Sequence, residues 1–190
     1  MSLNYIEEQT FDNIDYTLTS LPLAEYESCT FLNCDFSGQN LSKFKFLECH
    51  FQDCNLSLVK LGNTTLQNVR FDECKMLGIH FDECNRFGLS ISFSGCQLHH
   101  TTYYQLKLKK TVFRDCLIHE ADFSECDLSL SVFDKCDLSA TTFSNTVLEK
   151  TDFRTAFNYS IDPERNRMKK ARFSSQGLSG LLDKYQIDIS

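Results

Sequence analysis

The sequence of 190 residues contains no tryptophan, only two prolines and only seven glycines. Glycine and proline supply most tight turns, so this composition argues against a sandwich or barrel built from many hairpins. No apolar run is long enough to span a bilayer, and the first eight residues have neither the basic nor the apolar region of a signal peptide. The sequence therefore predicts a cytoplasmic protein with no membrane partner.

Positive charge is also scarce. Nineteen Lys and Arg stand against 26 Asp and Glu, which gives a net charge of -7. This balance argues against direct binding to nucleic acid or to an anionic membrane. The sequence has no Gly-rich phosphate loop, no nucleophile–base arrangement and no pair of catalytic carboxylates. It therefore predicts a protein that is not an enzyme and that uses no cofactor.

The sequence does contain a large apolar residue at every fifth position. Neither a helix, with a period of 3.6, nor a strand, with a period of 2.0, repeats in this way, so the chain must bend at fixed intervals. The residue two before each of these centres is usually small or apolar, which leaves two inward and three outward residues in every five. The centres form two runs, which are Phe11, Tyr16, Leu21, Tyr26, Phe31, Phe36, Leu41, Phe46, Phe51, Leu56, Leu61, Leu66, Phe71, Met76 and Phe81, and then Phe93, Leu98, Tyr103, Leu108, Phe113, Ile118, Phe123, Leu128, Phe133, Leu138, Phe143, Leu148 and Phe153.

A longer period of twenty lies on top of the period of five. Phenylalanine recurs at this spacing from Phe11 to Phe71 and again from Phe93 to Phe173, with one step of 22 between the two series. Four pentapeptides therefore make one turn of a solenoid, whose turns bury a core only by stacking. At a strand spacing of about 4.8 Å, roughly seven to eight turns make a rod about 35–40 Å long.

With this register, residues 11–157 resemble the pentapeptide-repeat proteins. Within that family, the segments Cys-Asn-Leu-Ser-Leu (54–58), Val-Arg-Phe (69–71) and Cys-Lys-Met-Leu-Gly (74–78) resemble the albicidin- and microcin-resistance proteins. The sequence bears a more distant resemblance to the Qnr quinolone-resistance proteins. The resemblance implies an all-β fold, a right-handed quadrilateral β-helix solenoid, and DNA gyrase or topoisomerase IV as the partner.

The whole chain, residues 1–190, is predicted to be one domain. Residues 1–10 are expected to form an N-terminal cap, residues 11–157 the β-helix with a two-residue break within 82–92, and residues 158–190 a terminal loop, a last strand and a short C-terminal helix. The apolar stripe of that helix would cover the open end of the core, since an uncovered last turn exposes strand edges. The resemblance also implies a homodimer through the same segment. The stripe consists of Leu178, Leu181, Leu182 and Tyr185.

The ten cysteines and five histidines are predicted to carry no chemistry. Every cysteine stands three residues after an aromatic residue, which is an inward position, and none forms a paired Cys-x-x-Cys zinc motif. Cysteine here acts as a small apolar residue. His99 and His119 are twenty residues apart and should stack on the surface, where a metal could bridge them, but a ladder of polar rings is the simpler interpretation. The sequence thus predicts no metal site.

The acidic residues are the main functional candidates. Most follow the Phe column, and two more lie one corner further along the chain. They could serve only solubility, or they could form an acidic patch that imitates DNA and docks on a basic topoisomerase surface. Duplex DNA carries one charge per roughly 1.7 Å, about 20 in 35 Å, so the rod as a whole is too weakly charged to imitate DNA uniformly. The candidates are Asp53, Asp72, Glu73, Asp82, Glu83, Asp115 and Asp134.

The break in the repeat is the second candidate site. Residues Asn85, Arg86, Phe87 and Gly88 occupy it, and Phe87 is expected to replace Arg86 as the inward residue. A bulge re-aims the local backbone, so the break has either a purely structural role or a role in partner contact. The sequence thus leaves two hypotheses for the protein: a noncatalytic protein that protects gyrase from a poison, or a scaffolding module for another partner.

Overall fold

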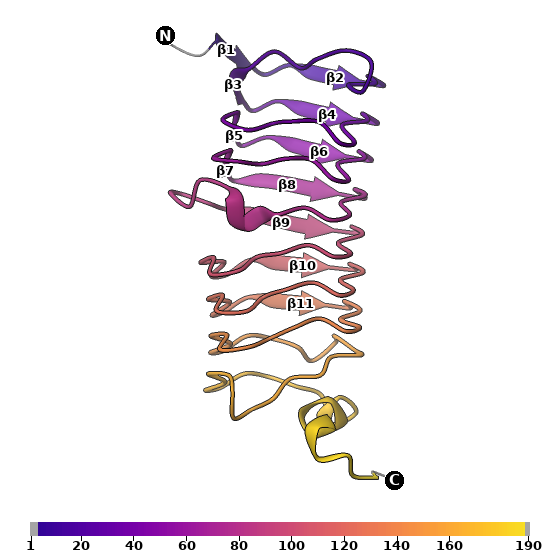
Figure 1. Cartoon of the computed structure of the whole chain (residues 1–190), viewed down its shortest axis with the longest axis vertical. Coiled ribbons are helices and arrows are strands. Elements are labelled where there is room, and N and C mark those ends of the chain that lie inside the picture. The colour runs from indigo at the N-terminus through magenta and orange to yellow at the C-terminus, as the bar shows by residue number, and fades with distance from the viewer. Residues whose placement is uncertain (1–3, 189–190) are drawn as a thin grey trace.

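The computed structural model describes residues 4–188, which form one straight rod with the two termini at opposite ends (Figure 1). The strands are short and parallel, and they recur at the same places in successive coils. They are β1 (Asn4–Glu7), β2 (Thr10–Asp12), β3 (Ala24–Glu27), β4 (Thr30–Leu32), β5 (Lys45–Leu47), β6 (His50–Gln52), β7 (Thr65–Gln67), β8 (Val69–Asp72), β9 (Ile91–Ser94), β10 (Val112–Arg114) and β11 (Val132–Asp134), with three 3₁₀ helices, η1 (Phe81–Glu83), η2 (Leu178–Leu181) and η3 (Asp183–Tyr185).

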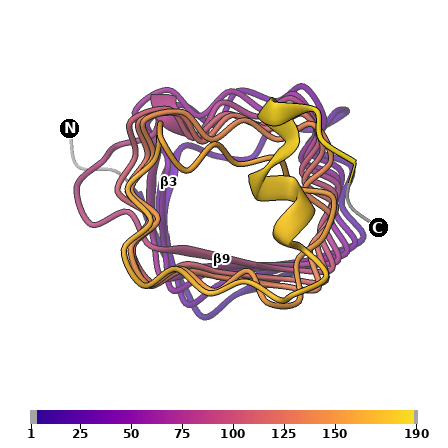
Figure 2. The ribbon, with the colours of Figure 1, turned by 90° about the horizontal axis from the view of Figure 1, so that it is seen from below.

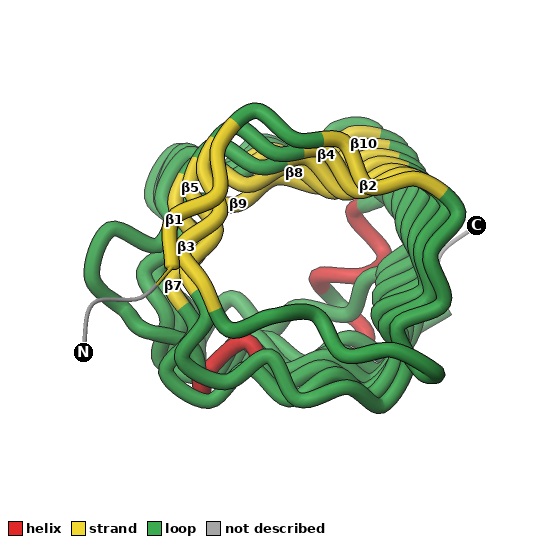
Figure 3. Tube along the Cα trace, turned by 90° about the horizontal axis from the view of Figure 1, so that it is seen from above, coloured by secondary structure: helices red, strands yellow, loops and turns green. Residues whose placement is uncertain are grey.

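The coils stack into a right-handed β-helix with four sides, as the view along the rod shows (Figure 3). Side one is the seven-stranded sheet β2-β4-β6-β8-β9-β10-β11. Side four holds the four-stranded sheet β1-β3-β5-β7 and, below it, bridges from Lys107 through Asp127 to Arg167. Sides two and three are ladders of isolated bridges between these two sheets. The predicted all-β solenoid is therefore confirmed.

The core is a set of stacked columns inside the rod. On side one the phenylalanine rings of neighbouring coils lie nearly parallel, with Phe93, Phe113 and Phe133 at centroid separations of 5.2 and 4.7 Å. From Phe71 to Phe153 each ring also meets a ring of side three edge-on, as Phe113 meets Phe123 at 5.8 Å and 86°. Both are favourable aromatic geometries. The column continues across the break, because Phe71 and Phe93 stack at 5.4 Å despite their spacing of 22.

Most corners are made by a residue with positive φ, two places after the centre. Asn33, Asp53, Glu73 and Asp115 all have φ near +50°. Such left-handed backbone is uncommon outside glycine, asparagine and aspartate. Here it is held by the coil below, since the N–H of Asp53 donates to the carbonyl of Asp72 at 3.0 Å. These corner residues direct their side chains away from the rod.

The break forms a loop that projects from side four (Figures 1 and 2). Before the loop, the N–H of Asn85 donates to the Thr64 carbonyl, and after it Ile91 pairs with Val69. Residues 86–90 therefore occupy the place that residues 66–68 occupy in the coil above, with two residues more. Phe87 is 82% exposed, so the expectation that it points inward was wrong. Gly88, with φ +69°, turns the chain back, and Leu89 packs against the core instead.

The N-terminal segment differs from the expected cap. β1 pairs with β3 and β2 pairs with β4, so residues 4–12 form walls of the first coil and do not lie across it. Ile6 and Phe11 are partly buried because they repeat the inward positions of Tyr26 and Phe31 one coil earlier. Residues 1–3 of that expected cap lie outside the described residues.

The C-terminal segment closes the lower end of the rod with 3₁₀ turns in place of the single helix expected (Figure 2). Gly177 and Gly180 weaken a longer helix, and both lie against Tyr159, where a Cβ on Gly180 would stand 2.1 Å from the Tyr159 carbonyl oxygen. Leu181 packs on the core, whereas Leu178 and Tyr185 are about half exposed. The expected last strand is reduced to one bridge, between Arg172 and Asp152.

None of the helices within residues 4–188 has the length and apolarity needed to cross a membrane.

Replacement of one core ring tests the stacked core. Phe113 is fully buried between Phe93 and Phe133, so Phe113→Ala should lower the free energy of unfolding by about 3–5 kcal/mol. Leu117→Ala, on an exposed outward position of the same coil, should change it by less than about 0.5 kcal/mol. Urea unfolding followed by circular dichroism measures both, and equal effects would contradict the assigned inward positions.

Candidate functional site

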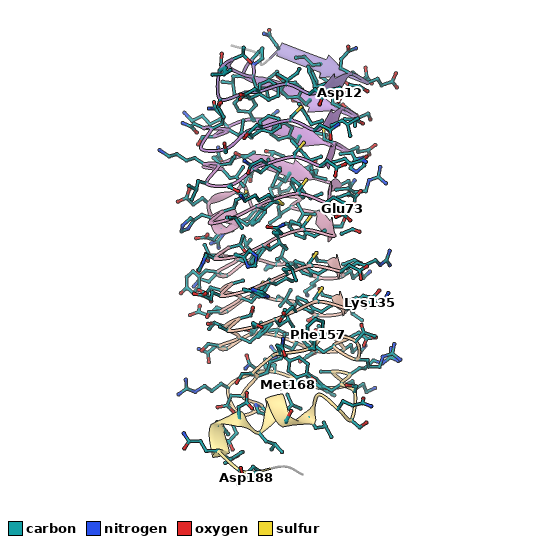
Figure 4. All side chains as sticks on the ribbon, turned by 90° about the vertical axis from the view of Figure 1, so that its right-hand side faces the viewer. Asp12, Glu73, Lys135, Phe157, Met168 and Asp188 are labelled. Atoms are coloured by element: carbon teal, nitrogen blue, oxygen red, sulfur yellow. The ribbon has the colours of Figure 1, made fainter. Side chains whose placement is uncertain are left out.

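Three of the predicted acidic residues share one edge of the rod, between sides one and two. Asp53, Glu73 and Asp115 occupy the same left-handed corner position in their coils, and all three are exposed. We call these three residues the acidic edge. Figure 4 shows Glu73 on this edge, with Asp12 above it and Lys135 below it. The corner geometry fixes the backbone under each carboxylate, so the charges are presented from a rigid support.

The carboxylates of the acidic edge have no basic partner among the ion pairs of residues 4–188. Asp72 and Asp134, beside them on side one, are different. Asp72 lies 2.6 Å from Nε2 of His50, and Asp134 lies 3.4 Å from Nε of Arg114. The predicted acids near side one therefore form two groups: those on the edge have no basic partner among the described residues, and those next to it lie against a histidine or an arginine.

A glycine in the next coil makes room for Glu73. Gly95 takes the corner position below Glu73 with φ +64°, and a Cβ there would stand 2.1 Å from Oε1 of Glu73. The carboxylate thus lies close against the bare backbone of Gly95, towards Asp115 in the coil that follows. The absence of a side chain at residue 95 keeps the edge open between Glu73 and Asp115.

Asp82 and Glu83 lie elsewhere. They belong to η1, at the corner between sides three and four, which is diagonally opposite the acidic edge. Oδ1 of Asp82 is buried without a hydrogen bond and stands 3.6 Å from Nδ1 of His80. Asp82 and Glu83 follow Asp72 and Glu73 by ten residues, which is half of a twenty-residue coil. The seven predicted acids therefore do not form one patch.

Two further acidic residues adjoin the edge and were not among the predicted ones. Asp15 and Asp35 face each other in neighbouring coils of side two. In each, the side-chain Oδ1 accepts a hydrogen bond from the backbone N–H two residues later and so stabilises the turn. Asp15 accepts from Thr17 and Asp35 from Ser37, both at 2.8 Å. Their spacing of twenty was visible in the sequence and placed them in one column.

The break residues form a firmly held loop. Oδ1 of Asn85 accepts the N–H of Phe87 at 3.1 Å, and Nε2 of Gln67 donates to the Phe87 carbonyl at 3.4 Å. Arg86 and Phe87 are both exposed at its tip. The loop is on side four, so it does not adjoin the acidic edge.

His99 and His119 lie side by side in one outward row, as expected, but their rings are tilted and not stacked. The rings of His99 and His119 lie 4.6 Å apart and tilted by 59°, and Nε2 of His119 stands 3.1 Å from Asp137. Partial burial and then the neighbouring His119 and His100 lower the pKa of His99. Across the described part of the chain, no three His, Cys, Asp or Glu side chains are grouped to hold a metal ion.

All ten cysteines are buried free thiols. Six of them, from Cys34 to Cys136, form one column beside the phenylalanines, and their Sγ atoms contact backbone carbonyls, as Cys74 contacts the Phe51 carbonyl at 3.4 Å. Burial raises the pKa of Cys49, Cys84 and Cys126 to about 12. Buried thiols of this kind are inert.

The surface hollows are shallow. One, of about 650 Å³, crosses the corner between sides four and one and is lined by His50, Arg70, Lys110 and Glu48, among others. A second, of about 580 Å³, lies between the last coil and the C-terminal turns, near Arg154 and Phe157. Neither encloses the acidic edge, which is a convex feature suited to docking.

The family model described as "Pentapeptide repeat region" matches residues 24–88 and 89–157, so the chain belongs to the pentapeptide-repeat family. No curated protein matches the sequence. Among solved structures, HetL of the cyanobacterium Nostoc sp. strain PCC 7120, a pentapeptide-repeat protein involved in heterocyst differentiation regulation, is 12% identical, with a TM-score of 0.64 over 92% of this chain and 88% of that chain. Full-length QnrB1, a plasmid-mediated fluoroquinolone resistance protein, is 18% identical, with a TM-score of 0.48 over 98% and 99%. The likeness to HetL supports the fold.

Thiol titration tests the structural role of the cysteines. The native protein at neutral pH should show no rapidly reacting thiol with an aromatic disulfide reagent, because all ten are buried. After denaturation in urea all ten should react. Rapid reaction of several thiols in the folded protein, or fewer than ten after unfolding, would mean that some are accessible, oxidised or bound to metal.

Proposed function

We propose that the protein is a noncatalytic, cytoplasmic binding protein that engages DNA gyrase or topoisomerase IV through the acidic edge. By occupying the DNA-binding surface, it would protect the enzyme from a topoisomerase poison. The observation that carries the proposal is the row of exposed carboxylates at Asp53, Glu73 and Asp115, which have no basic partner within residues 4–188. Membership of the pentapeptide-repeat family and the sequence resemblance to the resistance proteins support the choice of partner.

The charge density of the edge supports imitation of DNA on a local scale. Asp53 and Glu73 are one coil apart, and Glu73 and Asp115 are two coils apart, so the three carboxylates span roughly 14 Å at strand spacing. One DNA strand carries a charge per about 3.4 Å, or roughly four over this length. Three fixed carboxylates come close to that density, although the whole rod does not.

The other predicted acids have supporting parts in this proposal. Asp72 and Asp134 lie beside the edge, and release from His50 and Arg114 would let them add to the negative potential. Asp82 and Glu83, at the opposite corner, would not reach the same partner surface and would contribute mainly to solubility.

We further propose that the C-terminal turns form a homodimer contact. Leu178 and Tyr185 expose about half of their surface at the end of the rod. Lys184 links these turns to the loop around Asp162 and Glu164. Its Nζ forms ion pairs with Asp162 at 2.8 Å and with Glu164 at 2.7 Å. A rigid end with exposed apolar side chains suits end-to-end association, which would present two acidic edges to a two-fold symmetric topoisomerase.

A supercoiling assay with purified gyrase and a gyrase poison tests the function. The wild-type protein should restore supercoiling, and the triple variant Asp53→Lys/Glu73→Lys/Asp115→Lys should need about tenfold more protein or fail, because reversed charge opposes docking on a basic surface. The matched control Glu83→Lys/Glu120→Lys/Glu125→Lys reverses three exposed acids at other corners and should retain protection.

Equal loss in the control would show that overall charge, and not the edge, is responsible. If the wild-type protein gives no protection at stoichiometric excess, the proposal is wrong. An affinity capture that recovers no topoisomerase would then favour the scaffolding alternative.

A further inference from the structure

Side four carries charges of opposite sign at its two ends. In the coils above the projecting loop, its outward residues include five acids and one lysine, which are Glu7, Glu8, Glu25, Glu27, Lys45 and Glu48. In the coils below the loop they include seven basic residues and two acids, which are Lys107, Lys109, Lys110, Asp127, Glu149, Lys150, Arg167, Lys169 and Lys170. Although the net charge of the whole chain is -7, the part of side four below the loop is therefore basic.

The projecting loop lies at the centre of side four. The inward residues of this side are Ile6, Tyr26, Phe46 and Leu66 above the loop, and Leu108, Leu128, Leu148 and Met168 below it. Four coils thus lie on each side of the loop. The acidic and basic halves have equal length, and the exposed ring of Phe87 stands between them.

Part of the charge is already paired within the side. Lys45 contacts Glu25 at 2.8 Å, Lys109 contacts Asp127 at 3.2 Å, and Arg167 contacts Glu149 at 2.7 Å. The ion pairs of residues 4–188 leave the charges at the two ends of side four without such partners, namely those of Glu7 and Glu8 at the top and of Lys150, Lys169 and Lys170 at the bottom.

We propose that side four is an interface for a second copy of this chain, arranged antiparallel about a two-fold axis through the loop. A two-fold contact uses the same patch on both copies, so the patch must complement itself. Turning side four by 180° about the loop brings Glu7 and Glu8 of one copy opposite Lys169 and Lys170 of the other. It likewise brings Glu27 opposite the level of Lys150.

The size of the side suits a stable contact. Nine levels at about 4.8 Å and a width of five residues at about 3.3 Å give roughly 700 Å² per copy, and standard protein interfaces bury about 800 Å² per partner. A central apolar residue surrounded by charged residues is the common arrangement of such interfaces. The two loops would meet at the axis, and the long Lys and Glu side chains would span the separation that the loops impose.

Reciprocal charge reversal tests the arrangement. The tests use full-length chains that also carry Leu178→Ser/Tyr185→Ser, so that the C-terminal contact proposed above does not contribute. Sedimentation at low ionic strength, where screening is weak, should show a dimer of this parent chain. Glu7→Lys/Glu8→Lys alone and Lys169→Glu/Lys170→Glu alone should each weaken self-association at least about tenfold, since like charges then face each other.

An equimolar mixture of the two variants should form a one-to-one dimer, because each variant presents at both ends the charge that the other lacks. A parallel two-fold contact would instead place Glu7 and Glu8 of the two copies opposite each other in the parent chain, so it predicts no weakening by either variant alone. Phe87→Ser should weaken the dimer of the parent chain, and thermal unfolding of every variant should match the parent because all five positions are exposed. A monomeric parent chain at high concentration, or a mixture that stays monomeric, would overturn the proposal.

Discussion

The structure depends on the hydrogen bond that the left-handed corner residues make to the coil below. A residue with left-handed backbone is strained in isolation. Here its N–H donates a hydrogen bond to a carbonyl of the next coil: the N–H of Asn33 donates to the Gln52 carbonyl at 3.0 Å, and the N–H of Glu73 donates to the Ser94 carbonyl at 2.8 Å. This bond fixes the step of twenty residues and thereby places each phenylalanine over the one before it. The aromatic columns and the parallel ladders follow from the same step, since a register error would move every inward side chain.

The same constraint explains why the function must lie on the surface. Two residues in five fill the interior. All ten cysteines are buried there and pack as small apolar residues. The three remaining residues form straight columns along the rod, so any charge repeated at a spacing of twenty becomes a stripe. Asp53, Glu73 and Asp115 form such a stripe on one edge, and the charges of side four form another that changes sign at the loop.

Much of this architecture could be predicted from the sequence. The inward residues, the continuous phenylalanine column and the position of the break all follow from counting in steps of five and twenty. The same counting would have placed Ile6 in the wall of the first coil, where a cap was expected. The C-terminal helix was less predictable, because Gly177 and Gly180 fit against Tyr159, and that contact is not visible in any repeat.

The surface was predicted less well, because its electrostatics depend on side chains in neighbouring coils. Asp72 and Glu73 are adjacent in the sequence, yet the first is paired with His50 and the second lies free over Gly95. Glu73 and Glu83 each stand in a Phe-Asp-Glu-Cys segment, at 71–74 and 81–84, yet they lie at diagonally opposite corners. Phe87 points outward because a glycine turns the loop back after it.

Site-specific photo-crosslinking to gyrase tests the central claim most directly. Asn33 and Asn63 are matched positions, both exposed and both with φ near +55°, but Asn33 lies in the column of the acidic edge and Asn63 in that of the opposite corner. With a photoreactive residue at each position in turn, the account predicts cross-links to gyrase from position 33 and few from position 63. Equal cross-linking from both, or cross-linking from position 63 alone, would contradict it.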